Sequence, residues 1–295
     1  MLHPELAVST RAQVLDLLHP DLAAALRDGS PEALMSVVRG GDHTTPCRME
    51  DGVCPGVEAT GAPQGVYTIP VFEPHVMEML VAELKHAKES PVGPALSVPN
   101  NSGKPRDHRT GVVLEEIGLG GLAETLAGDV LSPFARLLHG AWTPWGIDSY
   151  HAFSIHVLHE HGSAPRAEPV SNNRVGDRLP RHVDVCESSM NVCLGNAGFN
   201  GSDVYFKHVL GSKRGQYVDE SDDEQLLTAP QDLQFVRHVP GRAFINLCQQ
   251  FHGTDTLTAG ERHAIVVRGL SSAFRRAPAE QFVEQCMAGV GAASA

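Results

Sequence analysis

The segment RHVDVCESSMNVCLG, residues 181–195, places a His-x-Asp pair just before an apolar run that is typical of a β-strand. In an extended chain, side chains two residues apart point to the same side, so His182 and Asp184 can reach one metal ion. Two other His-x-acid pairs stand near the N-terminus, where prolines and helix starts predict surface caps. We therefore expect residues 181–195 to carry a metal site at the head of a strand.

Two residues nearer the C-terminus complete the predicted site. His252 follows the apolar run Ala243–Leu247, which places it at the end of a neighbouring strand. Two histidines and one carboxylate form the facial triad of non-haem Fe(II) oxygenases. Arg262 opens the next apolar run, and a guanidinium there suits bidentate binding of a carboxylate. Each residue alone is more simply a surface or core side chain, but together the four predict an iron site with a dicarboxylate co-substrate.

Other polar side chains near these residues have simpler interpretations. Asn191 alternates onto the same face of its strand as Ser189 and Cys193, so its amide could reach the co-substrate or bond the backbone. His156, His159 and His161 look like a second metal cluster, but His156 and His159 would face opposite sides of an extended segment. We interpret these histidines as structural or, at most, as lining a cavity.

Short apolar segments separated by turns fill the chain after Tyr150. We predict strands at Ala152–Leu158, Val183–Val185, Met190–Leu194, Val204–Val209, Leu233–His238, Ala243–Leu247 and His263–Val267. Glycine and proline, 29 and 20 of the 295 residues, punctuate these segments instead of gathering in one linker. So many short strands after helices predict an α+β protein whose strands form a jelly roll or barrel.

Helical patterns dominate the first half of the chain. We predict one helix that is capped by Ser9 and ends near Leu18, and three further helices that start at Pro20, Pro31 and Pro74. A fifth helix is predicted from Gly121 to Leu138 with a kink at Pro133, and a strand at Val66–Phe72. We divide the chain into a helical extension and loop (1–65), a domain with the metal site (66–278) and a C-terminal tail (279–295). Residues 163–180 and 211–230 are predicted to be solvated loops, with a role as lids as the second interpretation.

Charge and hydropathy exclude several classes of protein. The chain has 35 Asp and Glu against 23 Lys and Arg, a formal charge of −12, which weighs against a nucleic-acid partner. There is no run of about 18 apolar residues and no charged segment followed by an apolar one at the N-terminus. We expect a cytoplasmic protein that does not bind a membrane.

The six cysteines do not form the framework of a disulfide-rich domain. Cys47 and Cys54 stand further apart than the cysteines of a structural zinc site, so we predict free thiols in a loop. Cys186, Cys193 and Cys248 lie inside apolar runs, and we interpret all three as small core residues.

From Val66 to Arg276 the chain resembles the Fe(II)/2-oxoglutarate-dependent oxygenases of the prolyl 4-hydroxylase-like group. It is most similar to the free-standing 2-oxoglutarate and iron-dependent oxygenase domain-containing proteins. The matching blocks, in family order, are Gly65–Phe72, Thr110–Leu114, Asp148–Phe153, His182–Asp184, Asn191–Gly195, Phe199–Phe206, His238–Arg242, Phe251–Gly253, Gly260–Arg262 and Ser271–Arg275. The resemblance implies a double-stranded β-helix (jelly roll) with N-terminal and supporting helices.

The same resemblance implies a function for each site residue. His182, Asp184 and His252 would be the catalytic iron ligands, Arg262 would bind the distal carboxylate of 2-oxoglutarate, and O2 would be the second co-substrate, with ascorbate as an optional reductant. The implied enzyme is a dioxygenase that hydroxylates an unactivated C–H bond of a peptidyl, prolyl or amino-acid-like substrate and releases succinate and CO2.

Three alternatives stay open. The chain could be a catalytically weak jelly-roll binding module, or a metalloenzyme of the cupin type that does not use 2-oxoglutarate. Arg262 and Arg268, with five residues between them, also resemble the arginine pair of nucleic-acid demethylases in the same superfamily, although the −12 charge is unfavourable for DNA.

Overall fold

A computed structural model describes residues 1–40, 65–90, 111–140, 143, 146–159, 182–195, 198–207, 233–248 and 250–276. The helical elements are η1 (Pro4–Leu6), α1 (Arg11–Leu17), α2 (Pro20–Asp28), α3 (Pro31–Ser36), α5 (Pro74–Glu89), η3 (Glu115–Ile117), α7 (Gly120–Thr125), η4 (Leu126–Leu131), α8 (Ser132–Leu138) and α10 (Ser272–Arg276). The strands are β1 (Arg39–Gly40), β2 (Tyr67–Pro70), β3 (Ser149–Leu158), β4 (Ser188–Gly195), β5 (Asn200–Gly201), β6 (Val204–Lys207), β7 (Leu233–Val236), β8 (Arg242–Leu247), β9 (Phe251–Thr254), β10 (Leu257–Ala259) and β11 (Glu261–Leu270). The predicted α+β class is confirmed.

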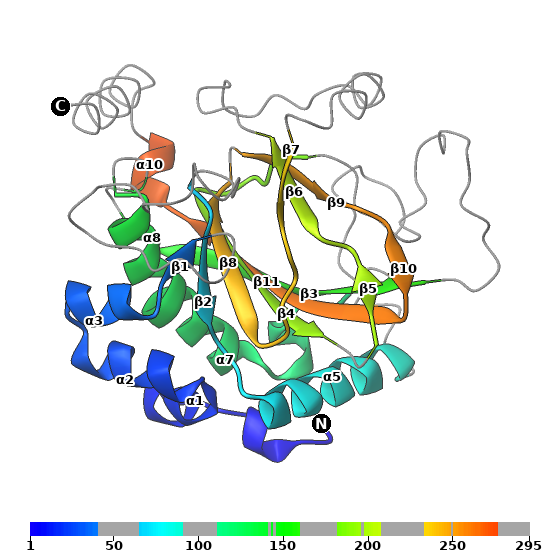
Figure 1. Cartoon of the computed structure of the whole chain (residues 1–295). Coiled ribbons are helices and arrows are strands. Elements are labelled where there is room, and N and C mark those ends of the chain that lie inside the picture. Colours follow the sequence, from blue (N-terminus) through cyan, green and yellow to red (C-terminus); the bar gives the residue numbers. More distant parts are fainter. Residues whose placement is uncertain are drawn as a thin grey trace.

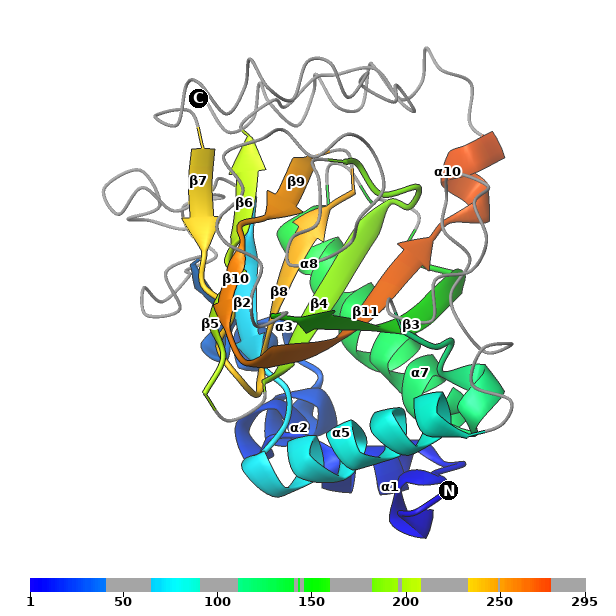
Figure 2. The ribbon, with the colours of Figure 1, turned by 90° about the vertical axis from the view of Figure 1, so that its right-hand side faces the viewer.

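Antiparallel sheets form the centre of the molecule (Figures 1 and 2). The largest has six strands in the order β1-β2-β8-β4-β11-β3, and a smaller one has the order β7-β6-β9. Strand β11 pairs with β3 on one side and β4 on the other. The two short strands β5 and β10 form a third pair. Helices cover one face of the six-stranded sheet, and the three-stranded sheet lies on the other side (Figure 2).

The predicted strand at Val183–Val185 is wrong. His182 forms an isolated bridge with His252, whereas the backbone N–H of Asp184 donates to the carbonyl of Cys248. The segment is therefore held at separate points and forms no strand. The other strand predictions agree with β3, β4, β6, β7, β8 and β11 within the described residues.

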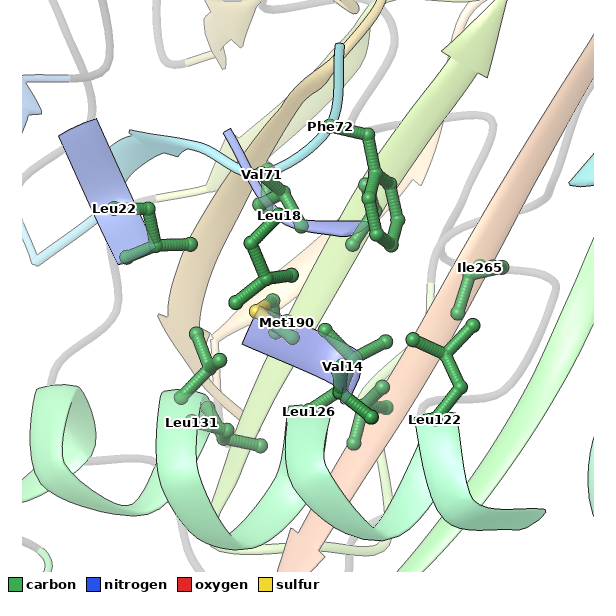
Figure 3. Close-up of a cluster of buried hydrophobic side chains, with 14 of the residues drawn as sticks. Val14, Leu18, Leu22, Val71, Phe72, Leu122, Leu126, Leu131, Met190 and Ile265 are labelled. Carbon is green, nitrogen blue, oxygen red and sulfur yellow. The ribbon is translucent and has the colours of Figure 1, made fainter. Parts of the chain in front are cut away.

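The helix-facing side of the six-stranded sheet holds the main apolar core. Met190 of β4 and Ile265 of β11 alternate onto this side, where Leu122, Leu126 and Leu131 lie against them (Figure 3). All five side chains are buried, and each contributes roughly 1.5–3 kcal/mol through removal from water. Apolar packing occupies most of this face, whereas the opposite face, on the side of His182, carries polar residues of the candidate site.

The irregular helix predicted around Pro133 is present, but its distortion lies earlier in the chain. Residues Leu126–Leu131 are π-helical, and α8 then starts at Ser132 with proline in its first turn. Proline has no N–H to donate, and its ring would clash with the carbonyl of Asp129, four residues earlier. A widened turn just before the proline relieves both problems and keeps the helix continuous.

The N-terminal helices share the core of the sheet. Leu6, Val14 and Leu22 are fully buried in the same cluster as the strand residues. The N-cap of α1 is Thr10, and the prediction of Ser9 is wrong, because Thr10 and Gln13 form a reciprocal capping box. The domain boundary at residue 65 stays a prediction, since residues 41–64 lie outside the described part of the chain.

The two larger sheets pack against each other through a second apolar cluster. It consists of Val66, Val204, Phe206, Val236 and Phe244. The rings of Phe206 and Phe244 meet edge to face with centroids 5.8 Å apart, which is a favourable geometry for aromatic rings. The candidate site residues predicted from the sequence also lie between these two sheets. No helix in the described residues is long and apolar enough to cross a membrane.

Candidate metal centre

The structure brings His182, Asp184 and His252 together. The imidazole Nε2 atoms of His182 and His252 each lie 3.7 Å from a carboxylate oxygen of Asp184, Oδ1 and Oδ2 respectively. One ligand atom from each residue lies within 4.8 Å of the others. Backbone hydrogen bonds between His182 and His252, with N–O distances of 2.8 and 3.0 Å, fix this arrangement.

His252 does not lie where the sequence placed it. We expected it at the end of the strand Ala243–Leu247, but it belongs to β9, a separate short strand that pairs with β6 opposite Phe206. The polypeptide leaves β8 and enters the three-stranded sheet. The metal centre therefore lies between the two sheets, with the rings of Phe206 and His252 stacked 5.7 Å apart.

The protonation of the centre suits a divalent cation. The Nδ1 of His252 is 2.9 Å from the carbonyl of Gln250, and because a carbonyl only accepts, Nδ1 carries the proton and Nε2 keeps its lone pair. Burial lowers the pKa of His252 to about 4, so the ring is neutral at pH 7. Burial alone would raise the pKa of Asp184, but His252, Arg268 and His182 lower it overall and keep the carboxylate ionised. The neutral Nε2 of His252 and the ionised carboxylate of Asp184, together with the imidazole of His182, are donor types that fit Fe(II).

Arg262 lies in the same inter-sheet region and is fully buried. Its Nε donates to Ser202 Oγ at 3.0 Å and its Nη1 to His238 Nε2 at 3.3 Å. His238 Nδ1 in turn donates to the carbonyl of Ser202 at 2.6 Å. Burial lowers the pKa of Arg262 to about 10, which leaves it charged at pH 7. Among the described residues, Arg262 forms no ion pair within 4.0 Å. The carboxylates of Asp203 and Asp255 act on it only from a greater distance, so no carboxylate contacts this buried cation directly.

Ser202 and His238 are residues that sequence reasoning did not assign. Ser202 is the one non-glycine residue with positive φ among the described residues, at 62°. That conformation is unfavourable for a side chain with a Cβ. Here the Ser202 hydroxyl accepts a hydrogen bond from Arg262, and the Ser202 carbonyl accepts one from His238. The block His238–Arg242 was part of the family resemblance, but no spacing rule connected His238 with Arg262.

Arg268, which the sequence suggested only as the second arginine of a demethylase-like pair, contacts the candidate metal ligands. It donates a hydrogen bond from Nη2 to Oδ1 of Asp184, and its guanidinium lies 4.9 Å above the ring of Phe153. The Nε of Arg268 is buried and makes no hydrogen bond. Strand alternation places Arg262 and Arg268 on one face of β11, and this signal was readable from the sequence.

Asn191 also lies on the inner face of its strand. It is flanked by Phe244 on β8 and Val266 on β11, and its Oδ1 is buried without a hydrogen-bond partner. The side-chain amide therefore does not bond the backbone through that oxygen, which leaves an acceptor next to the centre. Its contact with a co-substrate stays a prediction.

His156 lies on the opposite, helix-facing side of the six-stranded sheet. Its ring stacks on His263 at 4.2 Å, and its Nε2 lies 3.0 Å from Glu261. Lys85 and Lys88 of α5 contact Glu261 and His156 respectively. His156, Glu261 and His263 could offer metal ligands. The ammonium groups of Lys85 and Lys88 disfavour a further cation there, which agrees with a structural role for His156.

All three cysteines that we interpreted as core residues are buried, but two of them are joined in a disulfide that the sequence did not predict. Cys186 and Cys248 form a disulfide between residues 62 positions apart, with Cα atoms 5.4 Å apart. The backbone pairing of Asp184 with Cys248 brings them together, and this pairing cannot be read from the sequence. Cys193 is buried and unpaired as expected, whereas Cys47 and Cys54 lie outside the described residues.

Two histidines and an aspartate that could hold a metal ion, with a buried arginine on the same side of the sheet, match the donor set of the 2-His-1-carboxylate class. The relatives agree with this class. Residues 54–144 match the OGFOD2-like domain. The chain is 29% identical over 213 residues to the 2-oxoglutarate and iron-dependent oxygenase domain-containing protein ICU11 of Arabidopsis thaliana, covering 72% of this chain and 46% of that protein.

A mouse protein and a solved structure give similar matches. The chain is 26% identical over 262 residues to the 2-oxoglutarate and iron-dependent oxygenase domain-containing protein 2 of Mus musculus, covering 87% of this chain and 63% of that protein. The chain thus spans less than two thirds of the length of these two curated relatives. A prolyl-4-hydroxylase structure from Pseudomonas putida matches with a TM-score of 0.39 and 12% identity, covering 70% of this chain and 87% of that one. The family model and the two curated relatives confirm the resemblance predicted from the sequence.

Proposed function

We propose that the chain is an Fe(II)- and 2-oxoglutarate-dependent dioxygenase with a jelly-roll core formed by the two larger sheets. The observation that carries the proposal is the combination of the His182, Asp184 and His252 cluster with Arg262, a fully buried cation that no carboxylate among the described residues contacts directly. A dicarboxylate that binds iron through one end and Arg262 through the other explains both features at once.

The chain's own residues have separate tasks in this proposal. His182, Asp184 and His252 hold the metal, which supplies oxygen activation when it is bound. Arg262 binds the distal carboxylate of 2-oxoglutarate, and Ser202 and His238 orient its guanidinium through the hydrogen bonds to Nε and Nη1.

Two contacts next to the metal and the co-substrate complete the proposal. Arg268 orients the Asp184 carboxylate, and Asn191 offers its buried Oδ1 to the co-substrate region. The presence of Asp184 favours hydroxylation over halogenation, since a halogenase needs a small residue there to leave room for chloride.

The proposed reaction is hydroxylation of a C–H bond with release of succinate and CO2. The substrate class is a peptidyl or prolyl side chain, or a small amino-acid-like molecule. The relatives' names specify iron and 2-oxoglutarate and leave the substrate open. The inter-sheet position of the metal centre suits a substrate that enters between the sheets.

The test is reconstitution of the purified chain with Fe(II), ascorbate, 2-oxoglutarate and O2. We expect slow succinate formation without a prime substrate, and its loss in His182→Ala. The matched control is His75→Ala, at an exposed histidine of α5. Incubation with a peptide and metabolite library then identifies the substrate by a mass gain of one oxygen. Equal succinate formation by the wild type and His182→Ala would refute the proposal, and metal and 2-oxoglutarate binding without turnover would favour a binding module.

A further inference from the structure

A disulfide lies directly beside the metal-binding aspartate. Cys186 follows Asp184 by two residues, and its partner Cys248 precedes His252 by four. A carboxylate oxygen of Asp184 and the two Sγ atoms lie within 4.8 Å of one another. The same carboxylate also faces His182 and His252. Asp184 therefore belongs to two groups of potential metal ligands.

The two cysteines are held together by more than their covalent bond. The backbone N–H of Asp184 donates to the carbonyl of Cys248 at 3.0 Å, and the N–H of Cys248 donates to the carbonyl of Glu187 at 3.3 Å. These hydrogen bonds do not depend on the oxidation state of sulfur. Reduction would leave the Cα atoms of Cys186 and Cys248 close to their present 5.4 Å separation, so the two thiols would stay adjacent.

The surroundings determine which ligand such a pair can bind. Cys186 and Cys248 are 4% and 0% exposed, and Asp184 is 8% exposed. Two thiolates beside a buried carboxylate are stable only when a cation neutralises them. Sulfur donors favour zinc and similar soft cations, whereas the nitrogen-rich group formed with the histidines suits Fe(II).

We propose that Cys186 and Cys248 are a redox-controlled metal site that uses Asp184 as its third ligand. A small dithiol reduces the disulfide by thiol exchange: two electrons pass to the protein sulfurs, and the reductant becomes the oxidised disulfide. The two protein thiols then bind one thiophilic divalent cation such as Zn²⁺ as thiolates and release two protons. A small disulfide oxidant reverses the exchange: it accepts two electrons and becomes a dithiol, the Cys186–Cys248 bond forms again, and the cation is released.

The proposed site competes with the first metal centre for Asp184. Both carboxylate oxygens of Asp184 face the imidazoles of His182 and His252 at 3.7 Å. A cation bound to the sulfurs draws the carboxylate toward Cys186 and Cys248 and removes one ligand from the histidine site. This competition rests on the proposed function of the histidine site, whereas thiolate binding itself does not.

The test uses Co(II) as a spectroscopic probe of the complete chain. One half of a preparation is reduced with dithiothreitol and desalted under nitrogen, and the other half is kept oxidised. We expect a near-ultraviolet sulfur-to-cobalt charge-transfer band in the reduced half alone, and its removal by an equivalent of Zn²⁺. Cys186→Ser and Cys248→Ser should lose the band, whereas Cys193→Ser and a Cys47→Ser/Cys54→Ser double variant should keep it.

A His182→Ala variant separates this inference from the proposed function. It removes a ligand of the histidine site and should retain the thiolate band. Absence of the band in reduced wild-type protein, or its persistence in the Cys248→Ser variant, overturns the proposed thiolate site. Because the first comparison uses wild-type protein in two redox states, it holds even where a cysteine variant does not fold.

Discussion

Replacement of Arg262 by methionine separates binding of 2-oxoglutarate from stability. Burial lowers the pKa of Arg262 from 12.5 to about 10. The shift corresponds to about 3 kcal/mol by which folding disfavours the charged side chain at neutral pH. Methionine removes that penalty but also removes the hydrogen bonds to Ser202 and His238, each worth about 1.5–3 kcal/mol. The two effects oppose each other, so we expect the free energy of unfolding to decrease by no more than about 3 kcal/mol.

The same substitution also weakens the binding of 2-oxoglutarate. Loss of a charge-assisted bidentate contact weakens binding by about 3 kcal/mol or more, which is roughly 100-fold. At a concentration 100 times the wild-type dissociation constant, 2-oxoglutarate stabilises the wild type by about 2.7 kcal/mol and raises its melting temperature by roughly 5–10 °C. The same concentration should raise the melting temperature of Arg262→Met by only about 1 °C.

The assay is thermal unfolding with Fe(II) under nitrogen, with and without 2-oxoglutarate. The matched control is Arg242→Met. Arg242 is partly buried, donates a hydrogen bond to Thr68 Oγ1 at 3.2 Å, and lines a separate cavity beside α2 and α3. We expect Arg242→Met to keep the 2-oxoglutarate-induced increase. Retention of the increase in Arg262→Met, or its equal loss in both variants, refutes the assignment of Arg262 to the co-substrate.

Three more predictions concern the surroundings of the site and the core. His238→Leu removes an acceptor from Arg262 and should raise the KM for 2-oxoglutarate at least about tenfold, with Fe(II) affinity unchanged, measured by succinate formation and metal titration. Burial lowers the pKa of His139 to about 4, so its ring is neutral in the folded protein. Its contribution to stability is therefore complete above pH 6.5 and is lost as the pH falls toward 4. Between pH 7 and pH 5 this loss amounts to about 2 kcal/mol of the free energy of unfolding. Urea unfolding of His139→Gln should show a smaller decrease in that free energy over the same pH range. Leu122→Ala should lower the free energy of unfolding by about 2–5 kcal/mol through a cavity in the main core, measured in the same way.

Each of these predictions has an outcome that contradicts it. A His238→Gln variant can still accept a hydrogen bond, so a KM as high as that of the leucine variant would show that His238 does not act through Arg262. An unchanged pH dependence in His139→Gln would assign the acid sensitivity to other buried histidines. A loss below about 1 kcal/mol in Leu122→Ala would mean that the helix and sheet collapse around the missing side chain.

The sequence predicted the residues of the candidate centre better than their structural setting. Strand alternation was sufficient to place Arg262 on the face opposite His263, because period two is a local property of an extended chain. The position of His252 was wrong, since the turn after β8 redirects the backbone into another sheet, and only long-range pairing with Phe206 shows this. The disulfide between Cys186 and Cys248 was not predicted either, because it also depends on long-range backbone pairing.

The contacts around Arg262 explain why the metal ligands alone were an incomplete basis for function. A His–Asp–His group is compatible with several metalloenzymes and with binding modules. A fully buried guanidinium is different, because burial without a carboxylate in direct contact disfavours folding, and a bound anion would offset that cost. Ser202 adopts an uncommon backbone conformation and His238 a fixed tautomer around this charge. The stability given up at Arg262 is therefore the feature that distinguishes a dicarboxylate-dependent centre from a simple metal site.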